Sequence, residues 1–131
     1  MTITAALKTY LATITALTAK VSSRIYPDQA PQQPTYPYIV YNKITRTEGE
    51  INTPKGHYYQ YYQFAIYAKT YKETDDISEI IIASFLNKPF ATYTGIQIIN
   101  GNLFEHRDLP FDVTGIYSTI VSIKISFAIT E

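Results

Sequence analysis

Four of the seven prolines in the chain fall within residues 24–41, RIYPDQAPQQPTYPYIVY, and this segment restricts the fold more than any other. Each proline fixes its own φ, lacks a backbone donor and favours extended geometry in the residue before it. The segment is therefore predicted to be a stiff, extended connector, neither helix nor interior strand. Apolar runs on either side predict a helix before it and a strand that begins at Tyr38.

Hydrophobic periodicity predicts the remaining elements. Apolar residues three and four positions apart predict an amphipathic helix over residues 3–20. A second helix is expected to be capped by Asp76, with Glu79 completing a capping box and Lys88-Pro89 ending the helix. β-branched and aromatic residues predict four strands, over residues 38–47, 57–71, 95–107 and 116–129. The predicted fold is α+β: one domain over residues 1–131, with a mainly antiparallel four-stranded sheet and two helices packed on one face.

The dipeptide Asn100-Gly101 allows two interpretations of residues 96–107. It is a strong signal for a two-residue hairpin turn, which would divide the run into two short strands. It also fits a glycine bulge inside one long strand. The bulge is favoured, because two short strands would leave the long final strand without a partner of matching length.

Composition narrows the functional classes. The absence of cysteine excludes disulfides and thiolate metal sites and fits a reducing cytoplasm. Eleven basic and eleven acidic side chains balance, so no broad electrostatic surface for nucleic acid or anionic lipid is expected. The apolar N-terminal stretch contains Lys8 and several threonines and has no basic leader, so neither a targeting segment nor a membrane span is predicted.

No motif predicts catalysis. The chain lacks a phosphate-binding loop, a hydrolase nucleophile elbow and a zinc-protease helix motif. The run Glu105-His106-Arg107-Asp108 could supply a general base or metal ligands, but strand alternation puts Glu105 and His106 on opposite faces. These residues are interpreted as solvated charges at a strand end, and Asp75-Asp76 as helix-capping residues. No catalytic, metal or cofactor-binding residue is therefore predicted.

The 13 tyrosines favour association between subunits. Alternation places Tyr59, Tyr61 and Tyr67 on the sheet face that the helices leave uncovered, beside serines of the last strand. An alternative is a stacking platform for glycans or single-stranded nucleic acid. Nucleic acid fits poorly because only Lys55 and Lys69 flank the tyrosines, whereas a tyrosine-rich glycan-binding module stays open.

The order of segments carries a resemblance to a known family. The residues concerned are Arg24, Ile25, Tyr26, Pro27, Ala30, Pro31, Gln32, Pro37, Tyr38, Val40 and Tyr41. The strand residues 64–68, which lead to Tyr71, and residues 115–117 near the C-terminal strand support the resemblance. Over essentially its whole length, the chain resembles the tail-completion (tail terminator and tail-to-head joining) proteins of long-tailed bacteriophages. The heavy use of tyrosine and threonine departs from that family.

The resemblance implies a binding protein of the virion, assembled in the host cytoplasm. It implies a homo-oligomeric ring, a hexamer in the common case, which ends tail-tube polymerisation and docks the head–tail connector or a head-closure protein. Genomic DNA would pass through the ring without sequence-specific recognition, and no membrane is involved. The alternative within the virion is another neck or tail subunit, for head closure or the tube.

Two sets of contact residues are predicted on this basis. A ring needs unlike patches on each subunit. Residues expected at the subunit interface are Arg24, Tyr26, Pro31, Pro37, Tyr59, Tyr61 and Tyr67. Residues expected to contact the tube or the connector lie in two loops, and they are Glu48, Glu50, Asn52 and Lys55 in the first and Leu109, Phe111 and Asp112 in the second.

Overall fold

The computed structural model describes residues 3–27, 29–32, 34–48, 57–85, 91–93, 95–109 and 115–129. Within these residues the chain forms an α+β fold, as predicted. Its elements are α1 (Ile3–Ala12), α2 (Thr15–Val21), β1 (Ile25–Pro27), β2 (Tyr38–Glu48), β3 (His57–Ala68), α3 (Tyr71–Phe85), β4 (Ala91–Tyr93), β5 (Ile96–Leu109) and β6 (Tyr117–Ile129).

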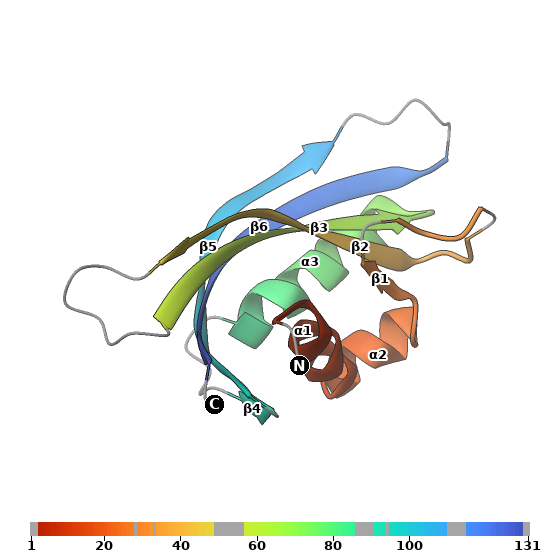
Figure 1. The fold of residues 1–131 in the computed structure, drawn as a ribbon. Helices are drawn as coiled ribbons and strands as arrows, with labels where there is room; N and C mark the ends of the chain where they lie inside the picture. Colours follow the sequence, from red (N-terminus) through yellow and green to blue (C-terminus); the bar gives the residue numbers. More distant parts are fainter. Residues whose placement is uncertain are drawn as a thin grey trace.

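The described strands form one sheet of six, in the order β1-β2-β3-β6-β5-β4. Every neighbouring pair is antiparallel except β1 and β2, which run parallel. The sheet bends around the helices, which all lie on its concave side (Figure 1). The prediction of four strands was wrong, because the two outermost strands have only three residues each and show no periodicity. None of the helices in the described residues is long and apolar enough to cross a membrane.

The helix predicted over residues 3–20 is two helices. α1 ends at Ala12, and Ile14, the residue before α2, has extended geometry with φ −85° and ψ 102°. The Thr13 hydroxyl donates to the carbonyl of Tyr10 at 2.6 Å. Threonine and isoleucine are weak helix formers, and such local side-chain bonds compete with the helix. The apolar stripe continues across the break, since both helices pack on the same core.

α3 begins five residues before the predicted cap. Thr70 Oγ1 accepts from the backbone N–H of Glu73 at 3.2 Å, as a helix-capping threonine does, and also lies 3.4 Å from the Glu73 carboxylate. Asp76 is therefore an interior helix residue, and its carboxylate lies 3.9 Å from Lys20 of α2. Tyr71, expected on the strand, is the first residue of this helix. The predicted end at Lys88-Pro89 lies outside the described residues.

The core lies between the concave face of the sheet and the three helices. The strand alternation predicted for β3 and β6 is confirmed, with one face of each strand buried against the helices. The largest core side chains are Tyr41, Tyr62, Phe64, Phe127, Ile3, Leu7, Leu11, Leu17, Ile39, Ile66, Ile77 and Ile81. The Tyr10 hydroxyl also donates to the carbonyl of Ser84, which joins α1 to α3.

Residues 96–109 form a single strand, so the bulge interpretation is confirmed. Its register with β6 shifts between Ile98 and Asn100, and again between Leu103 and Glu105. Gly101 lies directly under α3: an added Cβ would stand 2.8 Å from Phe85 Cβ and 3.0 Å from Ile123 Cγ2. The glycine thus lets the bulged strand approach the helix closely.

Gly101→Ala is expected to lower the free energy of unfolding by about 1–3 kcal/mol, because the methyl group overpacks this contact. Urea denaturation of the purified chain measures the effect. Asn102→Ala is the control: the exposed neighbouring residue should change stability by no more than about 0.5 kcal/mol. Equal stability of the two variants would contradict the close approach.

Candidate functional site

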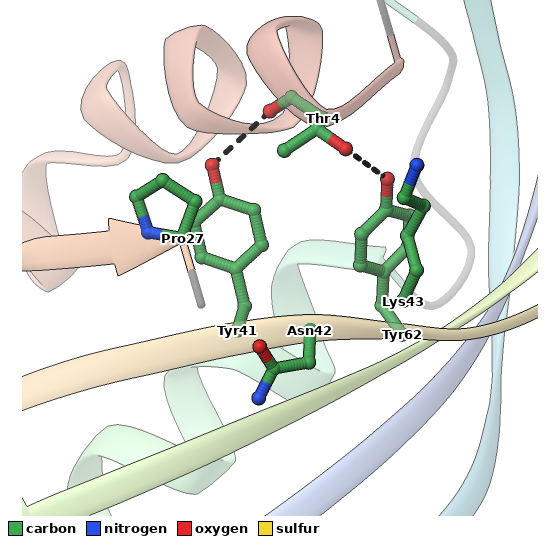
Figure 2. Close-up of a pocket in the computed structure, with 6 residues that line it drawn as sticks. All are labelled: Thr4, Pro27, Tyr41, Asn42, Lys43 and Tyr62. Carbon is green, nitrogen blue, oxygen red and sulfur yellow. Dashed lines mark hydrogen bonds between the residues drawn. The ribbon is translucent and has the colours of Figure 1, made fainter. Parts of the chain in front are cut away.

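A cavity of about 360 Å³ lies between the start of α1 and strands β1, β2 and β3, lined by Thr4, Pro27, Tyr41, Asn42, Lys43 and Tyr62. Figure 2 shows two tyrosine rings that rise from adjacent strands to meet one threonine. The Tyr41 hydroxyl donates to the carbonyl of Thr4 at 3.1 Å, and the Tyr62 hydroxyl lies 2.7 Å from Thr4 Oγ1. These polar groups bind α1 to the sheet, so the two tyrosine hydroxyls that line the cavity are engaged in structural hydrogen bonds.

Burial, and then the neighbouring Tyr62, raise the pKa of Tyr41 to about 12. The Tyr41 phenol is therefore neutral near pH 7 and cannot serve as a base there. A second hollow of about 380 Å³ lies between α1–α2 and α3, with a mainly aliphatic lining around Ile14 and Ile80. Neither hollow holds a carboxylate or an imidazole among its described lining residues.

Arg24 holds the C-terminal end of the proline-rich segment, here called the proline arm (residues 28–37). Its Nε donates to the carbonyl of Pro37 at 2.9 Å, and its Nη2 to the carbonyl of Lys20 at 3.5 Å. The backbone N–H of Ile39 donates to the Arg24 carbonyl at 3.0 Å. Arg24 thus ties Pro37, at the end of the proline arm, to Lys20 near the end of α2. Pro31, within the proline arm, is exposed.

Four tyrosines gather where the proline arm joins the sheet: Tyr26, Tyr36, Tyr38 and Tyr67, here called the tyrosine cluster. Tyr38 is central, with ring centroids 4.9 Å from Tyr67, 5.3 Å from Tyr36 and 6.2 Å from Tyr26. Burial, then the neighbouring Tyr36 and Tyr67, raise the pKa of Tyr38 to about 12. Lys69 Nζ lies 5.8 Å from the Tyr36 ring centroid.

The predicted interface residues fall into two groups. Arg24, Tyr26, Pro37 and Tyr67 converge at the tyrosine cluster. Tyr36 and Tyr38 were not predicted there, although the spacing of Tyr36 and Tyr38 around Pro37 could have indicated them. Tyr59 and Tyr61 lie further along β3, opposite Ser126 and Lys124 of β6.

The convex side of the sheet, here called the open face, has no described helix over it (Figure 1). It carries Tyr59, Tyr61 and Tyr67, all half-buried, beside the serines of β6. Lys124 Nζ lies 4.0 Å from the Tyr59 ring centroid, a cation–π contact. Ser118 Oγ is buried and has no hydrogen-bond partner among the described residues. The face combines aromatic area with polar tips, as subunit interfaces do.

The last described residues before the two predicted contact loops lie at opposite ends of the sheet. Glu48, paired with Tyr58, marks one end. Leu109 marks the other, because Leu109, Ser118, Tyr67 and Tyr38 follow one another across four adjacent strands. The tyrosine cluster therefore shares an end with Leu109. Glu50, Asn52, Lys55, Phe111 and Asp112 lie outside the described residues.

The charged run of β5 divides between the two faces, as alternation predicts. Glu105 pairs with Arg107 at 3.1 Å. His106 faces α3, and its Nε2 lies 3.0 Å from Ser78 Oγ. The Asp108 carboxylate accepts from the Tyr71 hydroxyl at 2.9 Å and from Thr119 Oγ1 at 3.2 Å. The hydrogen bond to Asp108 raises the pKa of Tyr71 above its usual range.

Comparison with known proteins decides the family. The model described as "Tail completion protein gp17" matches residues 2–106 of the chain. The chain belongs to this tail-completion family. It is therefore a structural protein of the phage virion, located in the tail.

A solved structure shares the fold of this tail-completion protein. A chain in the structure titled "Virion of native gene transfer agent (GTA) particle" matches with a TM-score of 0.67 and 8% identity. The match covers 92% of the present chain and 90% of the other. No curated protein sequence matches. The shared fold at such low identity shows that this fold tolerates almost complete replacement of its side chains.

Tyr41→Phe tests the bond between the sheet and α1. Loss of the hydrogen bond to Thr4 should lower the free energy of unfolding by about 1 kcal/mol at pH 7, measured by urea denaturation. Tyr117→Phe, at an exposed phenol, should change it by less than about 0.5 kcal/mol.

The Tyr41 pKa also predicts a pH dependence. Between the ordinary tyrosine pKa of 10.0 and about 12, the unfolded chain releases the Tyr41 proton while the folded chain keeps it. Stability should therefore be complete below pH 10 and fall as the pH rises through this window. The fall should be shallower in Tyr41→Phe, and an identical slope in both proteins would contradict the assignment.

Proposed function

We propose that this tail-completion protein forms a hexameric ring at the head-proximal end of the tail, where it ends tube polymerisation and joins the tail to the connector. Membership of the tail-completion family carries the proposal. The mechanism is binding: the ring occupies the last layer of the tube and offers a different surface to the next component. This function requires unlike contact surfaces on one subunit.

The two faces of the sheet supply unlike surfaces. One side of the subunit is helical, with the aliphatic hollow between α1–α2 and α3. The other is the open face, with its half-buried tyrosines and the buried, unsatisfied Ser118 hydroxyl. A buried polar atom without a partner is costly in the free subunit. A neighbouring subunit that supplied its partner would relieve that cost.

The proline arm and the tyrosine cluster are proposed as the fixed part of the subunit interface. Arg24 holds the end of the proline arm at Pro37, and the aromatic contacts of Tyr38 restrain the neighbouring tyrosine side chains. Side chains that are already ordered lose little entropy when a neighbour docks. Tyr26, Pro31, Pro37 and Tyr67 would thus contact the next subunit in a shape set before assembly.

The two predicted contact loops follow Glu48 and Leu109, which lie at opposite ends of the sheet, and these loops are proposed to contact different partners. The loop after Glu48, with Glu50, Asn52 and Lys55, and the loop after Leu109, with Phe111 and Asp112, would divide the tube protein and the connector or head-closure protein between them. A ring with one loop set on each side would let a single subunit contact both. Genomic DNA would pass through its centre.

Removal of the gene from its phage tests the position and the role together. Loss of a tube terminator should give headless tails of abnormal, often excessive, length in electron micrographs, and the plasmid-borne gene should restore normal tails. Cryo-electron microscopy of the virion should show six copies in one ring at the head-proximal tail end. Normal tail length without the protein, or density elsewhere in the neck or tube, would contradict the proposal.

The double substitution Tyr59→Ser with Tyr61→Ser is expected to weaken ring assembly at least tenfold, because it removes two aromatic contacts from the open face. Sedimentation analysis across a concentration series measures the effect. Tyr71→Ser with Tyr117→Ser is the matched control: it removes two tyrosines that are 51% and 45% exposed away from the open face. Equal loss of assembly in both variants would remove the open face from the interface.

Replacement of both Pro31 and Pro37 by glycine should weaken assembly more than it lowers the stability of the monomer. Glycine leaves the proline arm more conformations to lose on docking. Assembly is measured by sedimentation and monomer stability by thermal unfolding under dissociating conditions. Proportional losses of both would show that the proline arm supports only the subunit's own fold.

A further inference from the structure

Three side chains of metal-ligand type meet between α3 and β5. Asp75 and Glu79 lie one helical turn apart on α3, and His106 comes from β5. One ligand atom from each lies within 4.8 Å of the other two. All three residues are exposed, so a dissolved cation can reach them. Small rotations of exposed side chains would bring the three atoms to the spacing of a shared metal ion.

The second bulge of β5 directs the histidine toward the helix. The register shift between Leu103 and Glu105 brings His106 opposite Val121, a core residue on the helix side of β6. Strand bulges re-aim side chains in this way and are frequent beside functional sites. Glu105, on the other face, forms its ion pair with Arg107 and takes no part in the cluster.

A buried serine fixes the proton on the imidazole. Ser78 is 0% exposed, and its hydroxyl donates its single proton to the carbonyl of Asp75 at 2.8 Å. Ser78 Oγ can therefore only accept from His106 Nε2, which lies 3.0 Å away. This hydrogen-bond pattern assigns the proton to Nε2 and leaves the lone pair on Nδ1. Metal-binding histidines are held in the same manner, with the second ring nitrogen donating to a protein oxygen.

The two carboxylates carry negative charge that no described residue offsets by an ion pair. Like charges four residues apart destabilise a helix, and within the described chain neither Asp75 nor Glu79 has a cationic partner inside 4.0 Å. Asp108, two residues beyond His106, adds negative charge nearby, but both of its oxygens accept hydrogen bonds. A bound cation would offset the repulsion.

We propose that Asp75, Glu79 and His106 bind one divalent transition-metal ion of the Zn²⁺ class and so join α3 to β5. One imidazole nitrogen and two carboxylate oxygens form a donor set that Zn²⁺ accepts readily, with water in the remaining position. Mg²⁺ and Ca²⁺ prefer oxygen ligands alone. The site is independent of ring formation, since all of its ligands lie in one subunit.

Titration of the full chain with Zn²⁺, after removal of any histidine tag, tests the site. Isothermal calorimetry should show one ion per chain. His106→Ala and Glu79→Gln should each weaken binding at least tenfold. The matched controls are His57→Ala, which removes the other histidine of the chain, and Glu73→Gln on the same helix. Both controls should bind Zn²⁺ as the wild type does.

Two further measurements separate ligation from folding. Excess Zn²⁺ should raise the thermal midpoint of the wild type and leave that of Glu79→Gln unchanged, because only a ligand of the native state stabilises it. Ser78→Ala should weaken Zn²⁺ binding about 10- to 100-fold through loss of the fixed tautomer. Absence of binding up to millimolar Zn²⁺, unaltered affinity in Glu79→Gln, or equal affinity for Mg²⁺ would overturn the proposal.

Discussion

The pairing of β3 with β6 is the constraint on which the rest of the structure depends. Its register is unbroken from His57 opposite Ala128 to Ala68 opposite Tyr117. Because side chains alternate, this one register sends Tyr62, Phe64 and Ile66 into the core. The same register sends Tyr59, Tyr61 and Tyr67 to the open face. A slip of one residue would exchange the two sets. The hydrophobic core and the proposed interface are therefore set by a single choice of register.

Sequence periodicity predicted the parts of the fold that repeat over many residues. The long strands, the helix-covered face and the bulge between Ile98 and Asn100 follow from alternation and from the length of β6. Elements of three residues have no period to detect, so β1 and β4 were missed. The break between the first two helices was missed for a different reason: the apolar stripe runs through it, and only local hydrogen bonding at Thr13 ends the first helix. The sequence also contains the capping signal of Thr70 with Glu73. The prediction instead placed the helix start at the more acidic run Thr74-Asp75-Asp76.

The candidate site, like the fold, could be predicted from the sequence only in part. Individual residues such as Arg24 and Tyr67 were predicted, but their convergence depends on the parallel pairing of β1 with β2, a contact between segments on either side of the proline arm. The meeting of His106 with α3 could not be predicted, because two register shifts must be counted to know which way the strand faces there. Local patterns give the side-chain types at a site, whereas the packing of distant segments gives its geometry.

The outer strands of the sheet have a consequence for how copies of the chain can associate. β1 and β4 cover only three positions each of β2 and β5, so most of both long edges has no strand partner among the described residues. Such edges invite pairing with further chains unless bulges or charges oppose it. β5 carries two bulges and the run Glu105-His106-Arg107-Asp108 along its edge. Strand addition at the β5 edge is thereby discouraged, which leaves contacts between side chains as the main way for copies of the chain to meet there.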